Sequence, residues 1–191
     1  MYIAVDAMGG DYAPRAIVEG ALQAAQEYGI AVLLVGDREA ILHELHNAGG
    51  EESSLVAIRH ATETIAMGDS PITALRQKPD SSLQVAFQQV RAGEAAAVVS
   101  AGNTGAVLAL AVTILGNLAG VDRPAIVTAL PALGGHAYLL DAGANIECKP
   151  LHLVQFAIMG EVYARVIRGV PAPRVGVLSN GEEDSKGTDT T

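Results

Sequence analysis

The chain has 191 residues, of which half are hydrophobic, 4% are aromatic and none is Trp. It is long enough for one substantial domain whose core is built from Ala, Val, Leu and Ile, a composition that suits a parallel sheet covered by helices. The net charge of −9 excludes nonspecific binding to nucleic acid and makes an acidic carrier protein an electrostatically demanding partner. A single cysteine, Cys148, and a strand pattern directly after Met1 favour a reducing, cytoplasmic location without a secretory signal.

The first part of the chain alternates strand and helix patterns. Short apolar runs predict strands at residues 1–5, 31–35, 55–58 and 95–99. Apolar residues at helical spacing predict helices at residues 14–28, 37–48, 72–77, 83–92 and 107–115. This order predicts a parallel sheet with right-handed crossovers. The apolar segment before residue 115 is about half the length that a membrane span needs, so it is interpreted as a core helix.

The rest of the chain predicts a hairpin followed by a long helix. Two close strands at residues 125–130 and 137–140 flank a short turn, and a helix at residues 150–168 leads to a further strand at 175–178. With an antiparallel pair added, the sheet is expected to be mixed but largely parallel. Residues 1–191 are expected to form a single α/β domain.

A polar, glycine-containing turn at residues 100–105 joins a predicted strand to a predicted helix. Its backbone N–H groups and the helix dipole favour an anion, and Gly102 and Gly105 let a ligand approach the backbone closely. Ser100, Asn103 and Thr104 add side-chain donors. The same residues also suit a purely structural helix cap, so phosphate binding and capping both remain open at this point.

Three other predicted strands end in loops of the same kind. They lie at residues 6–11, 141–145 and 179–187, and each combines Asp or Asn with Gly. In open α/β sheets, ligands bind outside the carboxyl ends of the strands. A shared site built from these four loops is therefore expected.

These loops carry a resemblance to a known family. The matching stretches follow one another in order: Asp6-Ala7-Met8-Gly9-Gly10-Asp11 with Ala13-Pro14, Ala74-Leu75-Arg76, Asp80-Ser81-Ser82, Ser100-Ala101-Gly102-Asn103-Thr104-Gly105-Ala106, Leu140-Asp141-Ala142-Gly143-Ala144-Asn145, Cys148-Lys149-Pro150, Gly181-Glu182-Glu183 and Lys186-Gly187. Together they resemble the bacterial phosphate acyltransferases of the PlsX type. The sequence departs from that pattern at Ala142, where Val is usual, and at Ser179-Asn180, where Asn-Ile is expected.

The resemblance implies a reaction and a set of partners. Such enzymes move a long-chain acyl group from acyl carrier protein, or from acyl-CoA, to inorganic phosphate. The product is acyl phosphate for phospholipid synthesis, which a membrane glycerol-phosphate acyltransferase uses. The resemblance also implies a three-layer sandwich like that of isocitrate and isopropylmalate dehydrogenases, a homodimer, and a cytoplasmic or peripheral membrane location. Family members continue well beyond Lys186-Gly187, so the chain is expected to be the N-terminal portion of a longer, C-terminally truncated domain.

Phosphate is already a nucleophilic anion at neutral pH, so the site must bind it and stabilise the oxyanion rather than deprotonate it. Phosphate binding is assigned to the turn residues Ser100, Gly102, Asn103, Thr104 and Gly105. Catalytic contacts are assigned to three further residues, Lys186, Lys149 and Asn145. A supporting role, which holds the loops and orients the cations, is assigned to Asp6, Gly9, Gly10, Asp11, Asp80, Ser81, Asp141, Asn180 and Glu182.

No metal site and no cofactor are expected, because no His pair has zinc-binding spacing and Cys148 has no partner ligands. Three alternatives remain. Cys148 beside Lys149 is a candidate acyl-accepting thiol. A dehydrogenase of the related fold is disfavoured because no GxGxxG follows the first strand. A binding scaffold for acyl carrier protein or a membrane partner is the non-enzyme alternative.

Overall fold

The computed structural model describes residues 1–145, 147–179 and 181. The chain divides into two compact units, Met1–Gly116 and Asn117–Thr191, and each is described here by itself. The expected single domain over residues 1–191 stays a prediction.

The first unit contains a four-stranded sheet in the order β3-β2-β1-β4, in which every neighbouring pair is parallel. The expected alternation of strands and helices is confirmed here. The elements are β1 (Tyr2–Asp6), α1 (Arg15–Tyr28), β2 (Val32–Gly36), α2 (Arg38–Asn47), β3 (Val56–His60), α3 (Pro71–Gln77), α4 (Ser82–Arg91), β4 (Ala95–Val99), α5 (Thr104–Leu110) and the π-helical segment η1 (Ala111–Leu115).

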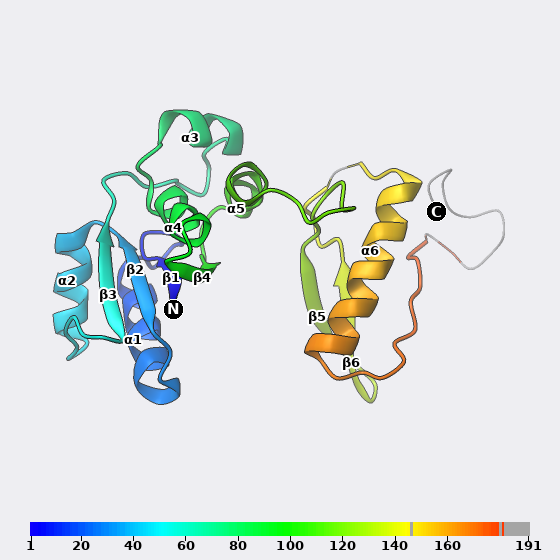
Figure 1. The fold of residues 1–191 in the computed structure, drawn as a ribbon, viewed down its shortest axis with the longest axis horizontal. Helices are drawn as coiled ribbons and strands as arrows, with labels where there is room; N and C mark the ends of the chain where they lie inside the picture. Colours follow the sequence, from blue (N-terminus) through cyan, green and yellow to red (C-terminus); the bar gives the residue numbers. More distant parts are fainter. Residues whose placement is uncertain (146, 180, 182–191) are drawn as a thin grey trace. The chain divides into compact units, whose positions relative to one another are not determined.

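Both faces of this sheet are covered, so its central strands are apolar on both sides. In β2, Val32 and Leu34 pack with α1 and α2, whereas Leu33 and Val35 point to the opposite face and pack with α4. Because successive side chains of a strand alternate between faces, the uninterrupted run Val32-Leu33-Leu34-Val35 fills both cores. The first unit thus has three layers, with α1 and α2 on one face of the sheet and α4 on the other (Figure 1).

Two helix ends of the first unit follow directly from local sequence. Helix α1 ends at Gly29, which adopts φ +64°, a left-handed conformation that a residue without Cβ reaches easily. Helix α2 begins after Asp37, whose Oδ1 accepts a hydrogen bond from the Ala40 N–H at 2.8 Å. These two residues therefore set where the chain passes from α1 into β2 and from β2 into α2.

Strand β4 forms one edge of the four-stranded sheet. Its five residues are all Ala or Val, and Ala96, Ala97 and Val99 are exposed. Ala97 and Val99 pair with Ile3 and Val5, which face the α1 side of the sheet, so that side of β4 is left uncovered by described residues of the first unit. Helices α4 and α5 pack around the other side, through Val98.

The second unit contains an antiparallel hairpin, β5 (Val127–Ala132) and β6 (Gly135–Leu140), and the helix α6 (Pro150–Val162), which continues as the π-helical segment η2 (Tyr163–Ile167). Tyr138 of β6 packs edge-on against Tyr163, with 5.5 Å between ring centroids. The hairpin and the long helix confirm the sequence prediction in this part of the chain.

The first unit contains the parallel sheet and the second unit contains the antiparallel hairpin, and a single mixed sheet stays a prediction. One detail of the predicted strands is wrong. The expected strand at residues 175–178 is irregular, because no described strand pairs with it and Val175, Val177 and Leu178 are all exposed. No helix in the described ranges is long and apolar enough to cross a membrane.

Candidate functional site

The loops after β1 and β4 lie side by side at the point where the strand order of the sheet reverses. From β1 the chain builds outward through β2 to β3, with α1 and α2 on one face, and β4 is then added on the other side of β1. In doubly wound folds, ligands bind outside the carboxyl ends of the strands at this switch point. The geometry confirms that two of the four predicted loops come together here.

Asp6, the last residue of β1, holds this pair of loops together. Its side chain is 2% exposed and accepts hydrogen bonds from Ser82 Oγ at 2.6 Å and Ser100 Oγ at 2.7 Å, as well as from the Met8 N–H. Ser82 is the first residue of α4 and Ser100 begins the turn after β4. The buried carboxylate therefore joins three separate segments of the chain, because each of them donates a hydrogen bond to it.

The two loops approach so closely that glycine is required at their contact. A Cβ on Gly9 would overlap the Asp6 carboxylate and lie 3.0 Å from Ser100 Oγ. A Cβ on Gly102 would lie 3.2 Å from the Cα of Gly9. Gly10 has φ +106°, and its Cβ would meet the Ala101 carbonyl oxygen at 3.1 Å. Gly9 and Gly10 therefore act through backbone packing.

Within the turn after β4, two of the three expected side-chain donors are engaged inside the protein. Ser100 Oγ donates to Asp6 and accepts the Gly102 N–H at 3.1 Å. Asn103 caps α5, because its Oδ1 accepts the Ala106 N–H at 3.0 Å, and its Nδ2 contacts carbonyls of residues 66, 67 and 69. Thr104 is exposed and its hydroxyl donates to no described residue.

The backbone of the same turn offers free donors. Among the described residues, the N–H groups of Ala101, Thr104 and Gly105 have no acceptor, and all three residues are exposed. Thr104 and Gly105 are the first two residues of α5, where the N–H groups of a helix lack partners within the helix, and Ala101 lies just before the N-cap residue Asn103. An anion is the ligand that such a set of amides favours.

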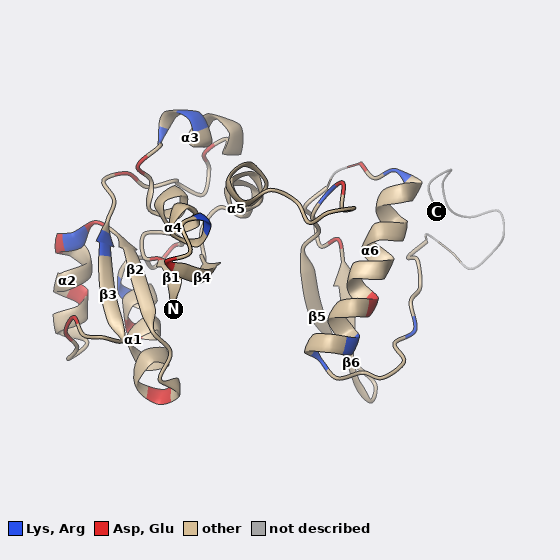
Figure 2. Ribbon diagram, viewed as in Figure 1, with Lys and Arg blue, Asp and Glu red and all other residues tan. Residues whose placement is uncertain are grey.

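In the segment that precedes α4, Asp80 and Ser81 have different surroundings. Asp80 does not cap α4: its carboxylate accepts the N–H and the hydroxyl of Thr62, at 2.8 and 2.5 Å, and these hydrogen bonds lower the pKa of Asp80. The N-cap position belongs to Ser81, whose side chain makes no capping bond and is fully buried. Lys78, just after α3, bonds Asp69 at 2.6 Å and lowers its pKa. Figure 2 shows how basic and acidic residues are distributed along the ribbon, with basic residues in and next to α3.

In the second unit, Asp141 organises the loop after β6 as Asp6 does in the first unit. Its carboxylate accepts the backbone N–H groups of Ile126, Ala144 and Asn145, and also Asn145 Nδ2 at 2.9 Å. Asn145 Nδ2 also donates to the Pro124 carbonyl at 3.1 Å. Both predicted loop residues therefore hold the connection between β6 and α6 in one conformation.

Acidification is expected to release this loop. Partial burial is the largest single influence and raises the pKa of Asp141, but the hydrogen bonds from Asn145, Ile126 and Ala144 together lower it below the ordinary value. Because the folded-state pKa is depressed, the stabilisation is complete above about pH 4 and is lost as the pH falls through the folded-state pKa. NMR titration should show the amide resonances of Ala144 and Asn145 shifting in that acidic window. Asp141→Asn should abolish the shift, and a shift that persists in this variant would assign it to another group.

The remaining predicted residues of the second unit are placed as follows. Lys149 is exposed and immediately precedes α6, and its N–H donates to Nδ1 of the buried His152 at 3.1 Å. Asn180, Glu182 and Lys186 lie outside the described residues. Asp11 is exposed in the loop after β1. In the described part of the chain, no three His, Cys, Asp or Glu side chains gather in a way that would hold a metal ion.

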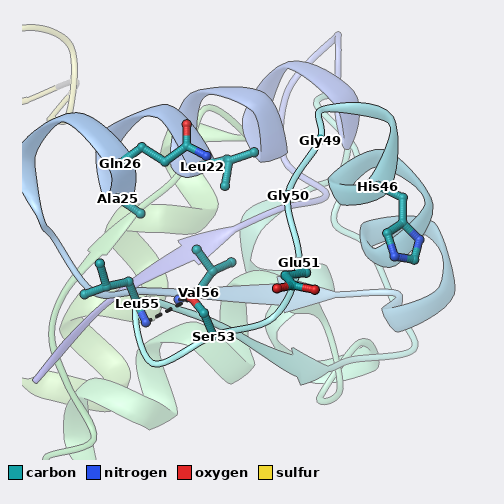
Figure 3. A pocket seen from close by; sticks show the side chains of 10 residues that line it. All are labelled: Leu22, Ala25, Gln26, His46, Gly49, Gly50, Glu51, Ser53, Leu55 and Val56. Atoms are coloured by element: carbon teal, nitrogen blue, oxygen red, sulfur yellow. Dashed lines mark hydrogen bonds between the residues drawn. The ribbon is translucent and has the colours of Figure 1, made fainter.

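A separate hollow of about 330 Å³ lies at the opposite edge of the parallel sheet, between α1, α2 and the chain that leads into β3. Figure 3 shows its lining side chains, which include Leu22, His46 and Glu51. None of its lining residues was predicted from the sequence as part of the site. Because it lies on the side where the strands begin, it is not continuous with the loops around Asp6.

Sequence reasoning missed two contributors to the loop cluster. Ser82 was recognised only as part of a motif, and nothing in its local sequence indicates that its hydroxyl reaches a residue 76 positions earlier. The loop at residues 66–69 has no part in the sequence analysis, although its carbonyls receive the Asn103 side chain. The Asp80-Ser81-Ser82 motif was the only sequence signal that pointed to Ser82. No sequence signal pointed to the loop at residues 66–69.

The fold and these loops define an α/β protein with polar, glycine-rich loops gathered at the switch point of a parallel sheet. The model of the family described as "Fatty acid synthesis protein" matches residues 1–191. A Geobacter sulfurreducens protein named phosphate acyltransferase is 56% identical over 193 residues, covering 100% of this chain and 55% of the relative. Proteins of the same name from Pelotomaculum thermopropionicum and an Anaeromyxobacter strain are 55% and 54% identical, covering 100% and 99% of this chain and 55% and 52% of theirs. The chain belongs to this fatty acid synthesis protein family, and it spans about half the length of these curated relatives.

Proposed function

We propose that the chain is part of an acyltransferase that transfers a long-chain fatty acyl group from acyl carrier protein, or from acyl-CoA, to inorganic phosphate. The product is an acyl phosphate for phospholipid synthesis. The family and the printed name of the relatives support the acyltransferase class. The donor and the direction of transfer are part of the proposal.

One observation carries the phosphate side of this proposal. The turn after β4 presents unpaired amides of Ala101, Thr104 and Gly105 at the switch point of the sheet, next to the exposed Thr104 hydroxyl. A phosphate dianion accepts several such donors at once. Because Ser100 and Asn103 already bond to protein groups, we assign phosphate contacts to the backbone of residues 101–105 and to Thr104 Oγ1, and a supporting role to the Ser100 and Asn103 side chains.

The reaction needs little proton transfer. An oxygen of bound phosphate attacks the thioester carbonyl carbon, a C–O bond forms, the C–S bond breaks, and the electron pair leaves with the carrier thiolate, which takes a proton from water. Catalysis then consists of holding phosphate in line with the thioester and stabilising the oxyanion. Lys149 and Lys186 remain the proposed contacts for the oxyanion and the phosphate charge. Asn145 Nδ2 already donates to Asp141 and to the Pro124 carbonyl, so we assign Asn145 a supporting role.

Asp6 does not fit a direct role in this chemistry. Its carboxylate is buried and surrounded by the Ser82 and Ser100 hydroxyls, and a second anion beside it would be repelled. We therefore assign to Asp6 the role of holding the turn after β4 in position. We further propose, from the family alone, that the protein works as a homodimer in the cytoplasm or at the membrane surface, next to a glycerol-phosphate acyltransferase.

The test is phosphate-dependent formation of acyl phosphate. The chain is incubated with acyl carrier protein loaded with palmitate and with ³²P-labelled phosphate, and labelled acyl phosphate is separated from free phosphate. The full-length Geobacter sulfurreducens relative is assayed in parallel to validate the substrates. We expect product from the chain, and Thr104→Val should raise the phosphate KM about tenfold, the usual effect of removing one hydrogen bond to a charged group.

Thr113→Val is the matched control, because Thr113 lies exposed in η1 beyond the turn. It should leave the phosphate KM unchanged. Binding of acyl carrier protein without product, under conditions in which the relative is active, would replace the proposal with the scaffold alternative.

A further inference from the structure

The side chain of Asn103 has no N–H left for a ligand. The residue is 8% exposed, and its Oδ1 is occupied by the Ala106 N–H at the beginning of α5. Its Nδ2 lies 3.0 Å from the Met67 and Asp69 carbonyl oxygens and 3.3 Å from that of Ala66. The two amide hydrogens are therefore shared among three acceptors, which is the full donor capacity of an Asn side chain.

The loop that receives this side chain is small and closed on itself. The Asp69 N–H donates to the Ala66 carbonyl at 3.1 Å, and the Ala66 N–H donates to Asp69 Oδ2 at 2.9 Å. Ala66, Met67 and Gly68 are exposed, so no apolar packing of these three holds the loop to the core. Apart from Lys78, which bonds Asp69 and the Thr64 carbonyl, Asn103 is the group that ties the loop to the rest of the first unit among the described residues.

The next residues of the same segment also touch the turn. A Cβ on Gly105 would lie 2.7 Å from Pro71 Cγ, the first residue of α3. The first turn of α5 and the beginning of α3 are thus in direct contact. The segment at residues 66–71 therefore contacts the proposed phosphate turn twice, through a polar contact of the loop at residues 66–69 and a steric contact of Pro71.

We propose that Asn103 is a positioning residue that couples phosphate binding at the turn to the order of the loop at residues 66–69. This rests on the phosphate site of the proposed function. When phosphate fixes the amides on either side of Asn103, the side chain is fixed in turn, and the loop carbonyls are held. The loop thereby becomes ordered when the acceptor substrate is bound, and its exposed residues form a part of the site whose shape depends on phosphate.

Amide hydrogen exchange of the intact chain, measured by NMR, tests this coupling. The variant is Asn103→Ser, because serine keeps an N-cap oxygen without adding charge but lacks the N–H groups that reach the loop. Phosphate is added to saturation, as judged by calorimetry for each protein, with ionic strength held constant. Asn47→Ser is the matched control, since Asn47 is the last residue of α2 and bonds only Glu44 among the described residues.

In the wild-type chain, saturating phosphate should slow exchange of the Ala66 and Asp69 amides about tenfold. In Asn103→Ser, these amides should exchange about tenfold faster without phosphate and should not respond to it, whereas Asn47→Ser should behave as wild type. Steady-state kinetics should show a raised phosphate KM with kcat changed less. A mere loss of folded structure would instead speed exchange throughout the first unit.

Two results would overturn the coupling: wild-type loop amides that do not respond to saturating phosphate, or loop amides of Asn103→Ser that respond as wild type does. The outcome is separable from that of the proposed reaction. Protection of the loop by phosphate without acyl phosphate formation would retain the coupling and remove the transfer reaction. Product formation without protection of the loop would retain the transfer reaction and remove the coupling.

Discussion

Asp6→Ala is expected to destabilise the first unit by about 3 kcal/mol, because it removes the shared acceptor of two serine hydroxyls. Ser82 Oγ and Ser100 Oγ both donate to this carboxylate; Ser82 is 1% exposed and Ser100 is half-buried. After truncation, the Ser82 hydroxyl has neither the carboxylate nor bulk water and carries the full desolvation cost, and Ser100 loses its acceptor. Urea unfolding followed by circular dichroism should show a lower midpoint with an unchanged slope.

Asp11→Ala is the matched control, since Asp11 lies in the same loop and is exposed. Its effect should stay within about 0.5 kcal/mol. A double-mutant cycle between Asp6→Ala and Ser100→Ala should return a coupling of about 1–2 kcal/mol, since the two side chains share one hydrogen bond. If Asp6→Ala proved no more harmful than Asp11→Ala, the carboxylate would not be what joins the loops after β1 and β4.

Gly9→Ala is expected to cost about 2–3 kcal/mol, because the new methyl group would overlap the Asp6 carboxylate. Neither group can withdraw easily. The carboxylate is fixed by Ser82 and Ser100, and the Gly9 backbone lies against Gly102. The same substitution should weaken phosphate binding, since the turn at residues 100–105 rests on this contact. Thermal unfolding and phosphate calorimetry measure the two effects.

Gly20→Ala is the matched control, and it is expected to raise the stability of the chain where Gly9→Ala lowers it. Gly20 lies within α1, is exposed, and has open space where its Cβ would be placed. Alanine there should stabilise the chain by about 0.5–1 kcal/mol through helix propensity alone. A Gly9→Ala variant as stable as Gly20→Ala would show that the two loops are not in close contact.

The helices and strands of the first unit could be predicted from the sequence because each has a local cause. The apolar run Val32-Leu33-Leu34-Val35, the cap at Asp37 and the stop at Gly29 all act within a few residues of their positions. The strand at residues 95–99 was placed with the bounds that the structure gives to β4. The strand expected at residues 175–178 was wrong because a strand exists only when another pairs with it, and composition does not report a partner.

The loop cluster was predictable as a location but not as a set of contacts. Asp6, Gly9, Gly10, Ser100 and Gly102 were all identified from the sequence, because strand ends rich in Asp, Asn and Gly meet at one sheet edge. The direction of each side chain was not predictable. Ser100 and Asn103 turn inward to bond Asp6 and the loop at residues 66–69, and these partners lie more than 30 residues away in the sequence. Such choices depend on the assembled tertiary structure.

The edge position of β4 has a consequence for how molecules of this chain behave toward one another. A strand of five Ala and Val residues, without charge or proline and with an exposed side, has the composition of segments that associate edge to edge. Within the described residues of the first unit, the strand carries neither a charge nor a proline at this edge, so long-range repulsion between copies helps to keep them apart. A net charge of −9 provides that repulsion at neutral pH. The acidity of the chain thus contributes to colloidal stability, and that contribution shrinks in concentrated salt or mild acid, where screening and protonation let two β4 edges meet.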